Sequence, residues 1–292
     1  ETGCYQLHCP PEMLQVRSFA GVGRLEQIAL MILRKYVERF YLRAHRRWEQ
    51  EQMTYQALDE SDENLIRSYE ARVKRSAADF LKTLREMLDD PGLYERDDGL
   101  PHRVHFDRHL YLPLLVEDMG EEPVVKYSPP GLNPGERHFV QQLRAYVGTE
   151  DGQSLLEERD RELFLLRNQA RGRGVGFLVD DEHFFPDFIL WLIGSGRQDI
   201  VFVDPHGLII GSNLAANQKV QFYRTIKEYE RKLNERAARD DIALHSYIVS
   251  QTSFEDLRKQ TAMGTPQEFN RLHVYFREQE YVRLLIEDVL AI

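Results

Sequence analysis

The chain has 292 residues, enough for two domains or one large domain with a well-buried core. Hydrophobic residues at 42% and charged residues at 29% are the composition of an ordinary soluble globular protein, and no run of about 18 apolar residues predicts a transmembrane helix. The formal net charge of −10 argues against a protein that coats nucleic acid indiscriminately, although arginine-rich segments leave local binding open.

The N-terminal sequence ETGCYQLHCPPE has no basic region followed by an apolar stretch, so we expect no signal peptide. It begins without methionine, and we expect the chain to be a piece of a longer protein. The cysteines Cys4 and Cys9 flank His8, but a metal site there has no evident fourth ligand. We therefore interpret both thiols as structural or incidental and predict the reducing cytoplasm as the compartment.

The sequence from residue 13 to about residue 119 is predicted to be mainly helical. Between residues 24 and 57, apolar residues recur at spacings of three and four, which places on one helix face Leu25, Ile28, Ala29, Ile32, Leu33 and Tyr36. A polar break at residues 58–64 (LDESDEN) precedes a second predicted helix at 65–88, which Pro91-Gly92 ends. Residues 102–115 are interpreted as a loop followed by a short apolar element that Pro113 stops.

The second half of the chain predicts alternating helices and strands. A connection rich in proline and glycine (127–135) leads into a helix that begins near Pro134, and an acidic insertion follows at 148–162. We expect strands at 164–166, 175–179, 185–193, 200–203 and 243–250, and helices at 213–236 and within 265–279, while the segment 282–290 is amphipathic. Without insertions, residues 136–250 give the order helix, strand, strand, strand, helix, strand.

Two aspartates lie at the ends of neighbouring predicted strands. Pro186-Asp187 opens one strand, and Asp204-Pro205-His206 closes the next. Aspartate is disfavoured inside a sheet, and either residue alone could simply belong to a turn. If the two strands pair as a hairpin, however, the carboxylates meet and offer the oxygen ligands that a hard cation such as Mg²⁺ prefers.

This order of elements, with Pro186-Asp187 and Asp204-x-His206 in it, resembles the PD-(D/E)xK nucleases and their restriction-endonuclease-like fold. The segments GLNPGERHFV, ELFLLRNQARGRGVGFL, FFPDFILWL, IVFVDPHGL and YIVSQT are similar to the C-terminal part of DEAD/DEAH-type helicase-nucleases, which are associated with prokaryotic restriction and phage defence. KYVERFYLRAHRRWE and RHLYLPLL are similar to the segment that joins the helicase motor to the nuclease. The resemblance covers nearly the whole chain.

The resemblance implies an α/β fold, in which a small mixed sheet flanked by helices follows a mainly α-helical region. The implied domains are residues 1–120, the connection to a helicase motor, and residues 121–292, the nuclease. The implied activity is hydrolysis of DNA phosphodiester bonds by an endonuclease that depends on Mg²⁺ or Mn²⁺. Its implied partners are DNA and a helicase motor in the same or a partner chain, with no membrane.

The implied metal ligands are Asp187, Asp204 and Glu136, the last from the helix that precedes the sheet. His206 stands where the family has lysine, and strand alternation places it on the same side as Asp204. Imidazole could act as a base or donor, or ligate a transition metal, but it could equally signal reduced activity. Lys219, on the predicted helix after the third strand, is an alternative source of the missing amine.

Arginines around a glycine-rich turn predict contacts with the DNA backbone, because glycine permits close approach of the chain. The candidate DNA-binding residues are Arg167, Arg171, Arg173 and Lys219. A solvated arginine-rich loop explains the first three equally well. Two other hypotheses stay open: a degenerate nuclease-like module that binds DNA or a partner protein without cleavage, and a purely structural module whose arginine-rich segment 34–47 contacts a partner. No GxxxxGK[ST] loop is present, so we expect no ATP hydrolysis.

Overall fold

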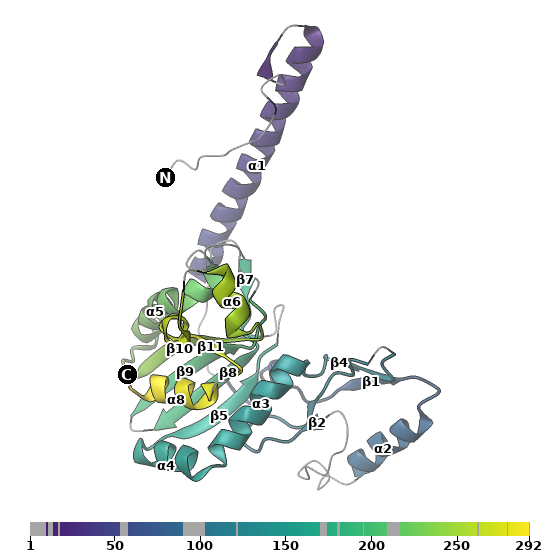
Figure 1. Ribbon diagram of the computed structural model, residues 1–292, viewed down its shortest axis with the longest axis vertical. Coiled ribbons are helices and arrows are strands. Elements are labelled where there is room, and N and C mark those ends of the chain that lie inside the picture. Colours follow the sequence, from purple (N-terminus) through teal and green to yellow (C-terminus); the bar gives the residue numbers. More distant parts are fainter. Residues whose placement is uncertain are drawn as a thin grey trace. The chain divides into compact units, whose positions relative to one another are not determined.

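The computed structural model describes residues 10, 14–16, 18–52, 58–89, 103–120, 122–169, 174–179, 182–194, 196–208, 217–261, 263–278 and 280–291. Contacts divide the chain into two compact units, Glu1–Gln56 with Asp180–Glu182, and Ala57–Val179 with His183–Ile292. The described part of the first unit contains one long helix, α1 (Phe19–Gln52), which confirms the helical prediction there (Figure 1). Cys4, His8 and Cys9 lie outside the described residues.

The second unit is built around a five-stranded mixed sheet in the order β11-β10-β9-β8-β5 (Figure 1). Its strands are β5 (Glu162–Arg167), β8 (Phe188–Gly194), β9 (Arg197–Asp204), β10 (Ile242–Ser250) and β11 (Val274–Phe276). The pairs β5–β8 and β8–β9 are antiparallel, whereas β9–β10 and β10–β11 are parallel. The parallel connection from β9 to β10 runs through α5 (Gln218–Ala237).

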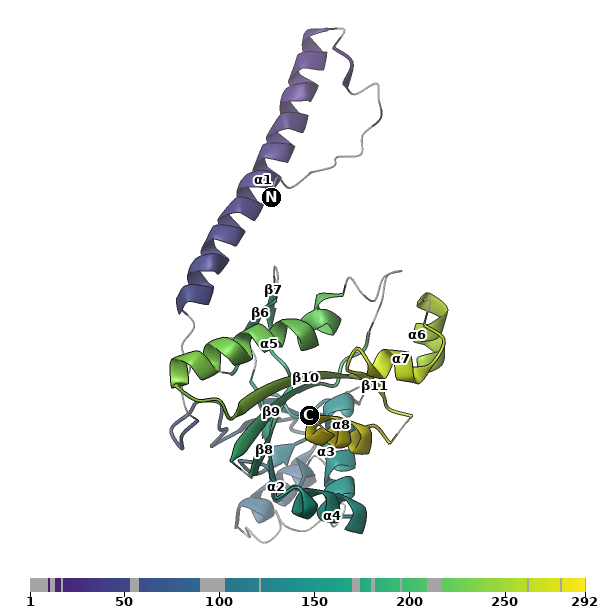
Figure 2. The same ribbon diagram turned by 90° about the vertical axis from the view of Figure 1, so that its left-hand side faces the viewer.

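Helices cover both faces of this sheet, which explains why its central strands are apolar on both sides. Phe139 of α3 (Pro134–Val147) packs on Phe188, and Tyr247 donates to Asp288 of α8 (Tyr281–Ala291) on the same face. On the opposite face, Glu230 of α5 accepts a hydrogen bond from the amide of Leu244. Figure 2 shows α5 on one side of β9 and β10, and α3 and α8 on the other.

Several predicted elements are confirmed with small shifts of their ends. The predicted start near Pro134 is explained by a capping box, in which Asn133 and Glu136 satisfy each other's backbone amides, with proline in the first turn. The acidic insertion contains a helix that was not predicted, α4 (Glu150–Glu158), capped by Thr149. The other short helices of the C-terminal part are α6 (Phe254–Gln260) and α7 (Pro266–Asn270).

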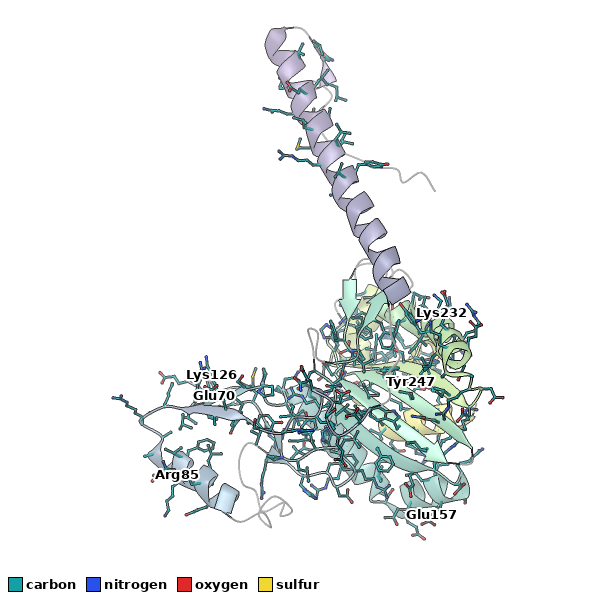
Figure 3. The ribbon with its side chains drawn as sticks, turned by 180° about the vertical axis from the view of Figure 1, so that it is seen from behind. Glu70, Arg85, Lys126, Glu157, Lys232 and Tyr247 are labelled. Carbon is teal, nitrogen blue, oxygen red and sulfur yellow. The ribbon has the colours of Figure 1, made fainter. Side chains whose placement is uncertain are left out.

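The predicted helix at residues 65–88 is wrong over its first part. Residues there form β1 (Glu70–Val73), which pairs antiparallel with β4 (Val125–Ser128), and only then does α2 (Ala78–Asp89) begin. The pairing places Arg72 opposite Lys126, and Figure 3 labels Glu70 and Lys126 on this two-stranded sheet. Further short strands, β2 (Arg103–Val104) and β3 (Leu114–Leu115), pair with each other. The mainly α-helical character predicted for residues 1–120 therefore holds for α1 but not for residues 57–120.

Two further predictions need correction. The predicted strand at 175–179 forms as β6 (Phe177–Val179), but it pairs with β7 (Glu182–Phe184) in a separate two-stranded sheet. The predicted last helix within 265–279 is interrupted, since β11 adds an edge strand to the main sheet. Contacts group residues 57–120 with the main sheet, while the functional boundary at residue 120 stays a prediction. Among the described helices, none has the length and apolar character needed to cross a membrane.

Candidate active site

The hairpin of β8 and β9 brings the two predicted aspartates face to face. Phe188 pairs with Val203 at the open end of the hairpin, so the next residues outward, Asp187 and Asp204, lie directly opposite each other. On the other side, the amide of Asn168 donates to the backbone carbonyl of Asp187 at 2.8 Å, which continues the pairing of β5 with β8. The carboxyl groups of Asp187 and Asp204 share a side-chain hydrogen bond. The sequence prediction that these two residues meet is confirmed.

The two carboxyl groups are crowded and largely removed from water. Burial, the charge of Asp204 and the charge of Glu136 together raise the pKa of Asp187 from 3.8 to about 9, and Arg167 opposes this only in part. Asp204 itself is 4% exposed. Two carboxyl groups this close repel each other when both are charged, and a divalent cation bound between them would relieve that repulsion.

Lys219 supplies a positive charge to this pair. Its Nζ lies 3.3 Å from Oδ2 of Asp204 and 5.2 Å from the centre of the Phe184 ring, so the ammonium group is held from two sides. The side chain retains 39% exposure and can be reached by a substrate. Asn217 caps the start of α5 and thereby directs the first turn of the helix, with Lys219 in it, toward the end of β9.

Glu136 lies near the pair but is already engaged. Its Oε2 accepts from the amide of Asn133 at 2.8 Å and from Nη2 of Arg167 at 3.0 Å. Among the described residues, no group of three or more His, Cys, Asp or Glu side chains is arranged to hold a metal ion. The two aspartates nevertheless fit Mg²⁺, which is commonly bound through one or two carboxylates with water and substrate phosphate completing its octahedron.

Arg167 is a buried part of the site's frame. Its guanidinium donates to the carbonyl oxygens of Pro130 at 2.6 Å and Gly131 at 2.9 Å as well as to Glu136, and its side chain is 13% exposed. These contacts fasten the connection before α3 to the end of β5. Contact of Arg167 with DNA therefore stays a prediction, as it does for Arg171 and Arg173, which lie outside the described residues.

His206 lies beyond the end of β9, because the strand stops at Asp204. The strand alternation that predicted its side chain beside Asp204 therefore does not extend to it. The side chain of His206 is exposed, and its backbone carbonyl accepts from the amide of Gln251 at 3.0 Å. A catalytic role for His206 stays a prediction.

Sequence reasoning missed a buried amide pair that supports the site. Asn168 donates to the carbonyls of Val175 and Pro186, both at 2.8 Å, and accepts from Nδ2 of Asn64 at 2.9 Å. Asn64 in turn accepts from the amide of Gln169 at 2.8 Å. This network fixes the chain on either side of Asp187. The polar segment 58–64 gave no signal for it, because the partners are more than a hundred residues apart.

His109 is a second supporting residue that the sequence did not indicate. Its Nε2 accepts from the amide of Arg167 at 2.8 Å, so its Nδ1 carries the proton and donates to the carbonyl of Tyr111 at 2.6 Å. Burial lowers the pKa of His109 to about 4, and the nearby charge of Arg167 acts in the same direction. The neutral imidazole thus joins residues 109–111 to the end of β5 beside the acidic pair.

Comparison of the chain with models of protein families, with curated proteins and with solved structures finds no significant match.

Proposed function

We propose that this chain carries a metal-dependent endonuclease that hydrolyses DNA phosphodiester bonds. The observation that supports this function best is the meeting of Asp187 and Asp204 across the open end of the β8–β9 hairpin, with Nζ of Lys219 3.3 Å from Asp204. Two acids and one amine at the end of a rigid hairpin are the functional groups of a PD-(D/E)xK site. In this proposal the amine is that of Lys219 on α5, because His206 occupies the position where the family has lysine.

The arrangement of elements supports a restriction-endonuclease-like core. With α4 and the β6–β7 pair set aside as insertions, the remaining elements α3, β5, β8, β9, α5 and β10 follow one another in the order that the motif comparison requires. The acidic pair lies at the ends of two central strands of this core, where the backbone is held by neighbours on both sides. Such a position keeps two carboxylates in one geometry through a catalytic cycle.

Mg²⁺ or Mn²⁺ at this place would lower the pKa of a water molecule and neutralise phosphate charge. Asp187 and Asp204 would hold the ion. Lys219, beside Asp204 and partly exposed, would orient the attacking water or stabilise the charge that develops on the phosphate oxygens. Glu136 would act through Arg167, by fixing the connection that precedes α3.

The motif resemblance extends this proposal to the chain's setting. We place the nuclease in the cytoplasm, attached to or associated with a helicase motor that acts in restriction or antiviral defence. In this proposal residues 1–120 provide the connection to the motor.

Incubation of the purified chain with plasmid DNA and Mg²⁺ or Mn²⁺ tests the proposal. We expect nicking or linearisation that Asp187→Asn and Asp204→Asn each reduce on the order of 10³-fold, because each removes a ligand of the cation. Asp240→Asn is the matched control, since Asp240 is an exposed acid in the turn before β10. Equal cleavage by all four proteins would trace the activity to a contaminant. DNA binding by the unmutated chain without cleavage would favour the degenerate binding module instead.

A further inference from the structure

We propose that Gln251 and Arg277 form a phosphate-binding subsite for the DNA strand next to the acidic pair. The inference deepens the proposed function, on which it rests, by assigning residues that hold the substrate. Neither residue belongs to the metal site or to the arginines that the sequence predicted as DNA contacts.

The topology of the sheet brings these residues to the same edge as the acids. The strands β9, β10 and β11 run parallel and side by side, so their C-terminal ends meet at one edge (Figure 1). Ser250 pairs with Phe276 in the last position of β10 and β11, and Gln251 and Arg277 are the residues that follow. The amide of Gln251 also donates to the carbonyl of His206, two residues after Asp204. A backbone hydrogen bond therefore joins the residue at the start of the subsite to the segment directly after Asp204.

The orientation of the Gln251 side chain is fixed by Arg277. Nη1 of Arg277 lies 2.8 Å from Oε1 of Gln251, and because a guanidinium can only donate, this oxygen is the acceptor. Nε2 of Gln251 is shielded from solvent and has no hydrogen-bond partner among the described residues. An unpaired buried donor costs free energy on the order of 1–3 kcal/mol, and a ligand oxygen that reaches this amide would remove that cost.

Arg277 contributes a cation that forms no ion pair with an acid among the described residues. Its side chain is exposed. Bonding to Gln251 restricts the guanidinium while it leaves other N–H donors directed to solvent. A restrained arginine beside an amide donor can grip one phosphate at two points, which is the geometry in which arginine binds phosphate best.

The floor of the subsite is the first turn of α3. A Cβ added at Gly135 would lie 2.7 Å from Nε2 of Gln251, so the amide group rests directly on the backbone at this glycine. The positive end of the α3 dipole lies there and adds to the attraction for an anion. Alanine at position 135 would favour the helix, but its Cβ would collide with the amide of Gln251. Glycine therefore leaves the space that this amide occupies.

The chemistry of this cluster fits the phosphate that neighbours the scissile bond. Asp187 and Asp204 alone would repel a polyanion, so an adjacent positive subsite is required to hold the strand against them. The contacts would be to phosphate oxygens only. We therefore expect them to strengthen binding of all DNA sequences alike.

Binding of a fluorescein-labelled duplex, followed by anisotropy in EDTA over a range of salt concentrations, tests the subsite without cleavage. We expect Arg277→Ala to weaken binding about tenfold and to lower the slope of log K against log salt by about 1. Gln251→Ala and Gly135→Ala should each weaken binding roughly threefold, because the first deletes the amide donor and the second displaces it. Arg277→Lys should restore part of the loss. Arg283→Ala, which removes an arginine paired with Glu287 on α8, should bind like the unmutated chain.

The outcomes separate this inference from the nuclease proposal. Unchanged affinity and salt slope in Arg277→Ala and Gln251→Ala would overturn the subsite, even if plasmid cleavage is observed. Binding that falls as expected in a chain that never cleaves would support the subsite and reject the nuclease. Failure of the unmutated chain to bind DNA at low salt would overturn the subsite as well. Because Gly135→Ala favours the helix, a loss of affinity in that variant cannot result from unfolding of α3.

Discussion

The two ends of β9 carry two buried aspartates whose neighbouring side chains have opposite charges. Asp199, near the start of the strand, is 1% exposed and is surrounded by cationic side chains and a histidine. Asp204, at the end of the same strand, is 4% exposed and faces another acid. The same residue type in the same strand therefore serves two purposes.

Asp199 is satisfied by the protein itself. Nε2 of His245 lies 3.0 Å away, Nη2 of Arg197 lies 2.9 Å away, and Nη2 of Arg161 lies 3.5 Å away. Burial alone would raise the pKa of Asp199, but the hydrogen bond from His245 and the charge of Arg197 hold it below its ordinary value. Arg161 also donates to the carbonyl oxygens of Gly194 and Arg197, so the cluster closes the turn between β8 and β9.

At Asp204 the balance is reversed. Lys219 is the cation that ion-pairs with it among the described residues, and the charge of Asp187 opposes it. The protein has thus crowded two acids together at one end of the hairpin and surrounded a single acid with cations at the other. Crowding of acids costs stability, and it is maintained where a ligand from solution completes the site.

Replacement of Asp199 should produce the largest change in stability. We expect Asp199→Asn to lower the free energy of unfolding by roughly 3–5 kcal/mol, because it leaves the buried charge of Arg161 without its partner. Urea denaturation followed by circular dichroism measures this. A loss below 1 kcal/mol would mean that the cluster is not a structural ion network.

Replacement of Lys219 should reduce cleavage and leave the fold intact. We expect Lys219→Ala to lower the cleavage rate on the order of 10²-fold, as for loss of one charge-stabilising donor, with little effect on the melting temperature. Lys232→Ala is the matched control, since Lys232 lies on the same helix but at the outer surface of the molecule (Figure 3). Equal rates for the two variants would exclude Lys219 as the amine of the site.

Replacement of Asp204 should have the opposite effect on stability from replacement of Asp199. In EDTA we expect Asp204→Asn to leave the free energy of unfolding unchanged or to raise it by about 1 kcal/mol, because it relieves the repulsion from Asp187. Added Mn²⁺ should raise the melting temperature of the unmutated chain and not that of the variant. A strong destabilisation by Asp204→Asn in EDTA would place Asp204 in the same structural class as Asp199.

The smallest expected effect is the contribution of Asp199 to the pH dependence of stability. Because its folded pKa lies below the ordinary value of 3.8, its contribution is present above that value and is lost as the pH falls through the folded pKa. The difference in unfolding free energy between the unmutated chain and Asp199→Asn should therefore be constant from about pH 5 to 7 and shrink below about pH 4. A difference that stays constant down to pH 2 would contradict the assignment.

The sequence predicted those parts of the molecule that depend on local pattern. Apolar runs located β5, β8, β9 and β10, and the aspartates at their ends predicted the acidic pair. Pairings between distant segments could not be predicted in this way. The strand β1 contains two charged residues and is a strand because it pairs with β4, and β11 was hidden in a segment that favours helix.

In the site, too, local sequence pattern predicted some residues, and contacts between distant segments determine the others. Asp187 and Asp204 stand at predicted strand ends, whereas Asn64 and His109 reach β5 and the residues after it from far along the chain. Glu136 stays a predicted ligand from the resemblance to nucleases with an acid in that helix, and its position as the third residue of the helix also suits a capping box. Asp199 gave no sign in the sequence of being different from Asp204, because its partners Arg161 and His245 are identified only by the strand register.

Anomalous diffraction from a crystal of the unmutated chain soaked in Mn²⁺, beside an Asp187→Asn crystal treated in the same way, shows whether the acidic pair binds a cation. We expect one strong anomalous peak within coordination distance of carboxylate oxygens of both Asp187 and Asp204, and its loss in the variant. A peak elsewhere in the molecule, or an acidic pair that stays free of metal at millimolar Mn²⁺, would contradict it.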